Sequence, residues 1–161
     1  MKKLLLATVA GLTFNMAHAA GYAMIDLERI VQNSTYLKQQ NASLQTTIKP
    51  QTTQLETLQK DLVAIDQKGQ KAKNQAEREK LGKDFEAKAQ QAAQLQQQIQ
   101  NTVQASMQNV NKTFEGRVKM AAEQLRAENK LDMVLNKNAV LAYNVKADLT
   151  DKMIQKVNAI K

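Results

Sequence analysis

The sequence has 161 residues, and its 23 Lys and Arg against 15 Asp and Glu give a formal net charge of +8. It contains no Cys and no Trp, and its single histidine is His18. The absence of Cys excludes disulfides. Apart from His18, the sequence also lacks the residues for the usual zinc sites and for His-dependent nucleophile pairs. We therefore predict a protein that is not an enzyme, with no catalytic, cofactor-binding or metal-binding residue.

The first 19 residues have the pattern of a secretory signal peptide. Lys2 and Lys3 precede an apolar run over residues 4–14, which is too short to span a bilayer, and residues 17–19 form an A-x-A cleavage site. We expect cleavage before Ala20 and export of the remaining chain, while an uncleaved N-terminal anchor is the alternative. Without Lys2 and Lys3, 21 basic and 15 acidic side chains remain, a net charge of +6.

The exported chain is predicted to begin with a short strand and a short helix. Residues 21–25 are small or apolar with one aromatic, as in a strand. Asp26 can cap the short helix, and Ser34 or Thr35 can cap the long helix that follows. The apolar face of the short helix is formed by Leu27, Ile30 and Val31.

Most of the chain carries helical periodicity. Residues 37–65 follow a heptad pattern, residues 81–125 carry a second apolar seam, and the polar stretch between them lacks an apolar anchor. Two such helices predict an antiparallel helical hairpin, a coiled-coil arm over residues 36–112 with a turn at about 66–74. The heptad continues unchanged through Pro50, so we expect a bend there and not a break.

The second helix is predicted to run from about residue 75 to about 129, so residues 108–128 outrun their partner and need a base to pack on. Residues 131–135 are predicted to form a strand that turns at 136–138 and returns as a second strand over 139–143. Thr150 is predicted to cap a last helix, with Leu149 packed on Ile154. So small a core favours strand pairing between subunits.

Basic residues gather where the arm should turn. Three lysines occur between residues 67 and 76 with no acid, and further basic residues follow among acids. Such a tip can steer acidic partners by long-range attraction, or it can be a solvated turn with i,i+4 pairs such as Glu79–Lys83. Both interpretations stay open. The tip residues are Lys68, Lys71, Lys73, Arg78, Lys80 and Lys83.

The descending helix also contains a long uncharged stretch. Residues 89–111 include no charged side chain and are dominated by Gln, Ala and Asn. Such a surface suits a broad, low-specificity partner, because no charge must be desolvated on binding. The alternative is a plain two-helix seam with a solvated amide face.

In this order of elements, and above all in the -LD-V- strand at 131–135 and the return over 138–144, the chain resembles the Skp (OmpH-type) family of periplasmic chaperones. The resemblance implies a mainly α fold with a small β base, in which a helical hairpin projects from a strand-paired, β-barrel-type trimerisation body of residues 20–35 and 113–161. It also implies a homotrimer whose arms surround a cavity. The residues assigned to the trimer body are Met24, Leu131, Met133, Leu135, Val140 and Tyr143.

The resemblance further implies an ATP-independent periplasmic holdase that binds unfolded outer-membrane β-barrel proteins and prevents their aggregation. A weak contact with an anionic membrane surface would fit the basic tip, while specific nucleic-acid binding is not expected. Positions aligned with a basic, lipopolysaccharide-associated cluster of some members are not basic here. Two other functions stay open, namely an adaptor that docks a folded envelope partner and a peripheral binder of anionic envelope surface. Those aligned positions are Leu95, Ala105 and Ser106.

Overall fold

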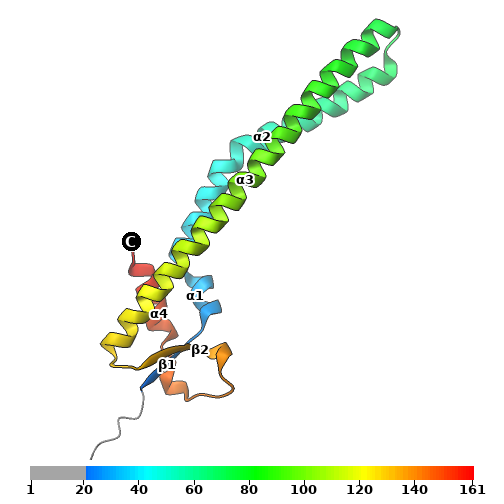
Figure 1. Ribbon diagram of the computed structural model, residues 1–161. Coiled ribbons are helices and arrows are strands. Elements are labelled where there is room, and N and C mark those ends of the chain that lie inside the picture. The colour runs from blue at the N-terminus through cyan, green and yellow to red at the C-terminus, as the bar shows by residue number, and fades with distance from the viewer. Residues whose placement is uncertain (1–20) are drawn as a thin grey trace, which may run out of the picture.

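The computed structural model describes residues 21–161, and the predicted signal peptide and its cleavage site lie outside the described residues. A small body carries a long two-helix arm that projects from one side (Figure 1). This confirms the predicted class, a mainly helical protein with a small sheet and a helical hairpin. The elements are β1 (Tyr22–Ile25), α1 (Leu27–Asn33), α2 (Thr35–Lys71), α3 (Gln75–Glu128), β2 (Met133–Asn136), the 3₁₀ turns η1 (Lys137–Ala139) and η2 (Val145–Ala147), and α4 (Thr150–Ala159).

The helix starts near the N-terminus follow the predicted capping pattern. The Asp26 carboxylate accepts a hydrogen bond from the backbone N–H of Arg29 at 3.1 Å and so caps α1. The hydroxyl of Ser34 accepts from the backbone N–H of Leu37 at 3.2 Å and caps α2, which settles the choice between Ser34 and Thr35. Ser34 is both the C-cap of α1 and the N-cap of α2, so a single residue ends the short body helix and starts the arm.

The first arm helix is longer, and the turn after it is shorter, than the sequence predicts, whereas α3 keeps its predicted bounds to within one residue. α2 continues through Pro50 without a break and runs on to Lys71, so only residues 72–74 link it to α3. The predicted turn at 66–74 is therefore too wide. Polar residues can extend a helix without an apolar anchor when they bond to one another, as Gln70 does by donating to Asp66 at 2.9 Å.

The sheet differs from the predicted hairpin. β2 pairs in parallel with β1, in the register Tyr22↔Met133 to Ile25↔Asn136, and the whole arm serves as the connection that parallel strands require. Residues 140–143 form no strand in the chain as described. The prediction of a second strand was wrong here because the Asn136 side chain accepts from Asn138 N–H and turns the chain into η1.

The core of the body forms where the C-terminal end of α3 meets α1, β1 and α4. Ala121 and Leu125 of α3 are completely buried against Ile30, Met153 and Val157. The predicted need of residues 108–128 for a surface beyond the arm is met by this cluster. The arm and the body therefore share one continuous helix, α3, whose C-terminal end is packed in the core of the body.

The start of α4 is held differently from the prediction. Leu149 occupies the capping position, and the carboxylate of Asp148 accepts from the N–H of Thr150 at 2.8 Å. The Thr150 hydroxyl instead accepts from the backbone N–H of Asp26 at 3.0 Å, a bond between segments 124 residues apart in sequence. Thr150 is thus a tie between β1 and α4, and the capping role falls to Asp148.

A buried carboxylate sits at this junction. Asp26 pairs with the ammonium group of Lys137, and its side chain is almost fully covered. The hydrogen bond from Lys137 lowers the pKa of Asp26 below its ordinary value, against the opposing effect of burial, and the same bond raises the pKa of Lys137. The pair fastens η1 to the strand–helix corner of the body.

Candidate functional site

The arm is held together along one narrow seam. Leu58 of α2 and Leu95 of α3 are buried between the helices, and a salt bridge from Lys88 Nζ to Asp61 Oδ2 at 2.6 Å crosses from one helix to the other. At the root, the Arg117 guanidinium lies 4.2 Å from the centre of the Tyr36 ring. Two helices alone expose most of their surface, so the arm presents a large area to solvent.

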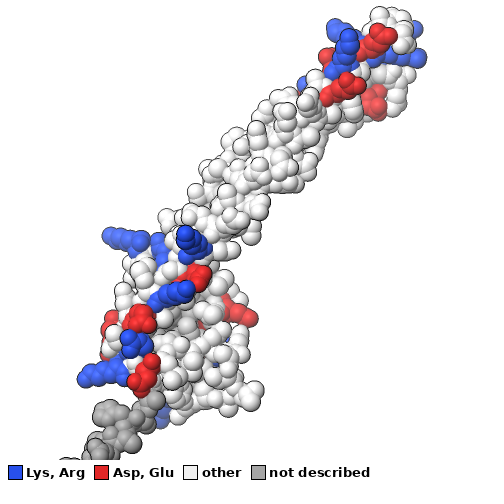
Figure 2. Space-filling model, viewed as in Figure 1, with Lys and Arg blue, Asp and Glu red and all other residues white. Residues whose placement is uncertain are grey.

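The middle of the arm carries a single charged side chain across its two helices. Residues 89–111 of α3 contain no charged side chain, and residues 39–55 of α2 contain only Lys49. Figure 2 shows this uncharged surface as a continuous pale stretch between a charged tip and a charged body. We call it the uncharged mid-arm. The sequence predicted its α3 half, and the hairpin adds a matching half from α2.

A shallow apolar groove runs along α3 in the uncharged mid-arm. Ile99, Val103 and Met107 line it together with glutamine and asparagine side chains, and it encloses about 390 Å³. Met107 is 56% exposed, although the seam pattern predicts it to be covered. Its thioether and the flanking amides can adapt to partners of different shape, because neither carries a charge that must be desolvated.

The six predicted basic residues gather at the far end of the arm. Lys68 and Lys71 lie in the last turns of α2, Lys73 in the link, and Arg78, Lys80 and Lys83 at the start of α3. All six are exposed, and within residues 21–161 none forms an ion pair closer than 4.0 Å. The i,i+4 pair Glu79–Lys83 is absent from those residues. The free ammonium groups can therefore interact with an external anion.

The acids of the tip are bonded locally, which leaves these cations free. The Glu77 carboxylate accepts from the backbone N–H of Lys73 at 3.2 Å, and Glu79 accepts from the Gln75 amide at 3.1 Å. Asn74 caps α3 through Glu77 N–H at 2.9 Å. The tip therefore carries both signs of charge, and of these two carboxylates Glu77 bonds to the link while Glu79 bonds to a side chain of its own helix.

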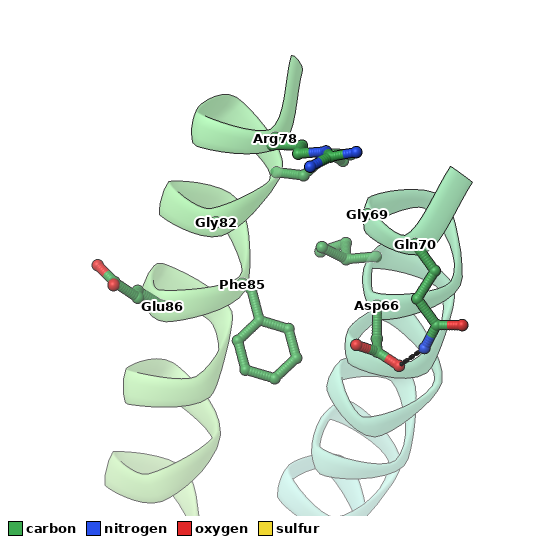
Figure 3. Close-up of a pocket in the computed structure, with 9 residues that line it drawn as sticks. Asp66, Gly69, Gln70, Arg78, Gly82, Phe85 and Glu86 are labelled. Atoms are coloured by element: carbon green, nitrogen blue, oxygen red, sulfur yellow. Dashed lines mark hydrogen bonds between the residues drawn. The ribbon is translucent and has the colours of Figure 1, made fainter. Parts of the chain in front are cut away.

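A hollow opens between the helices just below the link, and sequence reasoning missed it. Ile65 of α2 and Leu81 and Phe85 of α3 give it an apolar lining, and it encloses about 620 Å³ (Figure 3). The sequence assigned these three residues to the closed seam. Gly69 and Gly82 border the same space, and local spacing in the sequence gives no signal that the two would lie together. We call this feature the tip hollow.

The residues assigned to the trimer body are divided between the interior and the surface of the chain. Met24 is 1% exposed inside its own chain, whereas Met133 is exposed at the edge of β2. Leu131, Leu135, Val140 and Tyr143 are half-buried. Two apolar residues outside the assignment are far more exposed, Leu141 completely and Val145 at 80%.

Two kinds of site are absent from the described part of the chain. Among residues 21–161, no helix has both the length and the apolar character needed to cross a membrane. Over the same residues, no three His, Cys, Asp or Glu side chains come close enough to hold a metal ion.

The fold thus defines an arm-bearing protein, in which a small mixed body anchors a long helical hairpin. Residues 21–157 match the family model described as Outer membrane protein (OmpH-like), and the chain belongs to this family. It is 30% identical to a Skp-like protein of Chlamydia pneumoniae, over 98% of this chain and 96% of that one. These matches confirm the predicted resemblance to the Skp (OmpH-type) chaperone family.

A solved structure shares the fold. The chain superimposes on a crystal structure from Caulobacter crescentus, described as an outer membrane chaperone (OmpH-like), with a TM-score of 0.72. The alignment covers 97% of this chain and 91% of the other at 21% sequence identity. At this identity the likeness concerns the arrangement of arm and body.

Proposed function

We propose that this protein is an ATP-independent periplasmic holdase, which binds unfolded outer-membrane β-barrel proteins between the arms of a homotrimer and prevents their aggregation. The observation that carries the proposal is the uncharged mid-arm, an extended surface with an adaptable apolar groove and no charge to desolvate. Membership of the OmpH-like family supports it.

The mid-arm surface suits unfolded chains better than folded partners. A folded partner is held by a few buried anchors in matched pockets, whereas the mid-arm offers only a shallow groove and amides. Each contact with an unfolded client would be weak. Several arms acting on one client would gain affinity through effective concentration, which requires more than one chain.

The body supports assembly into such an oligomer. Its sheet has two strands, fewer than usually make a stable sheet, and its loop exposes Leu141 and Val145. Strands from other subunits could pair with a free edge of the sheet and cover these side chains. The homotrimer is the state that the family resemblance implies.

The test is dilution of a urea-unfolded outer-membrane β-barrel protein into buffer with increasing amounts of this protein. Light scattering follows aggregation, and native mass measurement follows the stoichiometry. We expect scattering to fall and to saturate near one trimer per client without ATP. Unchanged scattering at a several-fold excess would rule the holdase out and favour an adaptor that docks one folded envelope protein.

The free cations of the tip favour a second function, contact with an anionic envelope surface. Lys68, Lys71 and Lys73 would approach such a surface first, because they lie at the far end of the arm. Binding to vesicles that contain an anionic lipid, compared with neutral vesicles, tests this function. Replacing the three lysines with Gln should abolish the binding, whereas a holdase so altered should still capture clients.

A further inference from the structure

The tip hollow lies between α2 and α3 just below the link that joins them. Phe85 extends from α3 into the space between the helices (Figure 3), and Asp66 and Gln70 of α2 also line the hollow. The Phe85 side chain is 39% exposed, unlike Leu95 further down the same seam, which is buried. Within the described residues no side chain fills the hollow, so one aromatic face is left open to solvent.

Two glycines border the hollow. A Cβ atom built on Gly69 or on Gly82 meets no atom within 4 Å, so neither glycine is needed to let the helices approach. Neither has a positive φ, and glycine is less favourable than alanine inside a helix. Alanine would fit at both positions and strengthen both helices. A longer side chain at either position therefore has open space to occupy.

The rim of the hollow is polar but does not select for charge by itself. Asp66 is held by the Gln70 amide at 2.9 Å, and the Arg78 guanidinium crosses the top to donate to the carbonyl of Ala72 at 3.4 Å. Glu86 points away from the space between the helices (Figure 3). The near rim therefore offers one acid, one base and one amide around an apolar floor.

The wider surroundings favour a negatively charged ligand. Residues 67–76 carry Lys68, Lys71 and Lys73 and no acid, and none of the three is paired within residues 21–161. Such a set attracts carboxylates over about 8–10 Å at ordinary ionic strength. An occupant of the hollow would thus meet an aromatic floor and, one or two residues away, free ammonium groups.

We propose that the tip hollow binds one aromatic side chain from an acidic segment of an unfolded polypeptide. The ring would stack offset or edge-on against Phe85, and the neighbouring carboxylates would face the three lysines. This inference rests on the proposed function and names the client feature that the tip selects. The uncharged mid-arm then supplies contacts that do not depend on client sequence.

The test uses the fact that the protein contains no tryptophan. A short, unstructured acidic peptide with one central Trp is mixed with the purified protein, and the emission of that Trp alone reports binding. We expect a blue shift that saturates. Unlabelled peptides that carry Phe, Leu or Ala at the central position, or Lys in place of the acids, are then added as competitors. The Phe peptide should displace the probe, and the other three should compete about five- to tenfold less well.

Two variants, each with a matched control, separate binding in the hollow from non-specific apolar binding to the arm. Phe85→Ala should weaken binding of the Trp peptide about five- to tenfold, whereas Val63→Ala, which removes another exposed apolar side chain of the arm, should not change it. Gly82→Leu fills the hollow while favouring the helix, so it should abolish binding without unfolding the arm. Ala87→Leu adds the same side chain to an exposed position outside the lining and should bind normally.

Equal competition by the Leu peptide, or normal binding by Gly82→Leu, would overturn the proposal. The aggregation assay is run on the same samples so that the two ideas fail separately. If Gly82→Leu and the parent bind the peptide equally while the parent suppresses aggregation, the hollow is excluded and the holdase stands. If the parent binds the Trp peptide as expected but leaves aggregation unchanged, the hollow stands and the holdase is excluded.

Discussion

The body and the arm of this protein use their residues in opposite ways. In the body, Leu125 and Met153 are completely buried, and hydrogen bonds tie segments more than 100 residues apart, such as Asp26 and Thr150. In the arm, one seam and one cross-helix salt bridge hold two helices whose remaining surface faces solvent. We infer that the body supplies most of the stability of the fold. The residues on the arm surface are then not needed for packing and can serve binding.

The largest effect should come from the body. Leu125→Ala removes a fully buried side chain where α3 meets α4, and we expect a loss of about 2–5 kcal/mol in the free energy of unfolding. Urea denaturation followed by circular dichroism measures it. Val31→Ala, an exposed apolar position on α1, is the control and should change stability by less than about 0.5 kcal/mol. Equal losses in both variants would show that the body core is not where stability resides.

The second effect concerns capture without loss of stability. Gln104→Lys combined with Met107→Lys places two charges in the mid-arm groove. We expect the concentration that halves client aggregation to rise about three- to tenfold, because each charge must be desolvated when a client binds. Gln98→Lys with Ala105→Lys adds the same charge at exposed positions outside the groove. If the control pair impairs capture equally, net charge and not the groove is responsible.

The third effect is a pH dependence that belongs to the body. Because Lys137 lowers the pKa of Asp26, this carboxylate contributes stability above its unfolded pKa of about 3.9 and loses it as the pH falls through its folded value. Lys137, with a raised pKa, contributes below about 10.4 and loses its contribution as the pH rises beyond that. Both contributions are therefore present at neutral pH.

Asp26→Asn should accordingly lower the free energy of unfolding at neutral pH, and its stability curve should approach that of the parent as the pH falls below about 4. Chemical denaturation across this pH range measures it. Glu28→Gln, which removes an exposed carboxyl next to the same corner, should run parallel to the parent curve. A constant offset for Asp26→Asn down to the lowest pH would exclude the linkage.

The same contrast explains how far the sequence could be interpreted. Periodicity located both arm helices and the overrun of α3 into the base, and capping residues located the start of α1 at Asp26 and of α2 at Ser34, because these features depend on local spacing. Strand pairing in the body was misassigned. A hairpin from 131 to 143 looks correct locally, whereas the observed partner of β2 lies more than 100 residues away at the N-terminus. Sequence spacing carries no signal for such a pairing.

The features of the candidate site also differ in whether the sequence could predict them. The basic tip and the uncharged stretch could be predicted because each is a property of composition. The tip hollow could not, since it depends on the place where the link falls. With the link at residues 72–74, Gly69 and Gly82 both border one space, and Phe85 opens into it instead of closing the seam. A link six residues shorter than the predicted turn at 66–74 thus separates a closed seam from a pocket.

The smallest effect should be that of the basic tip. Replacing Lys68, Lys71 and Lys73 with Gln removes three free cations from exposed positions, so no packing is lost and stability should not change. What changes is the long-range field, which speeds association with acidic clients and is screened by salt. Stopped-flow association with an unfolded acidic client should be several-fold slower for the variant at low ionic strength. The two proteins should converge near about 1 M salt, where the Debye length falls to about 3 Å. If the difference persisted there, the lysines would act through direct contact, which would place them within the binding surface of the tip and couple them to the hollow beside them.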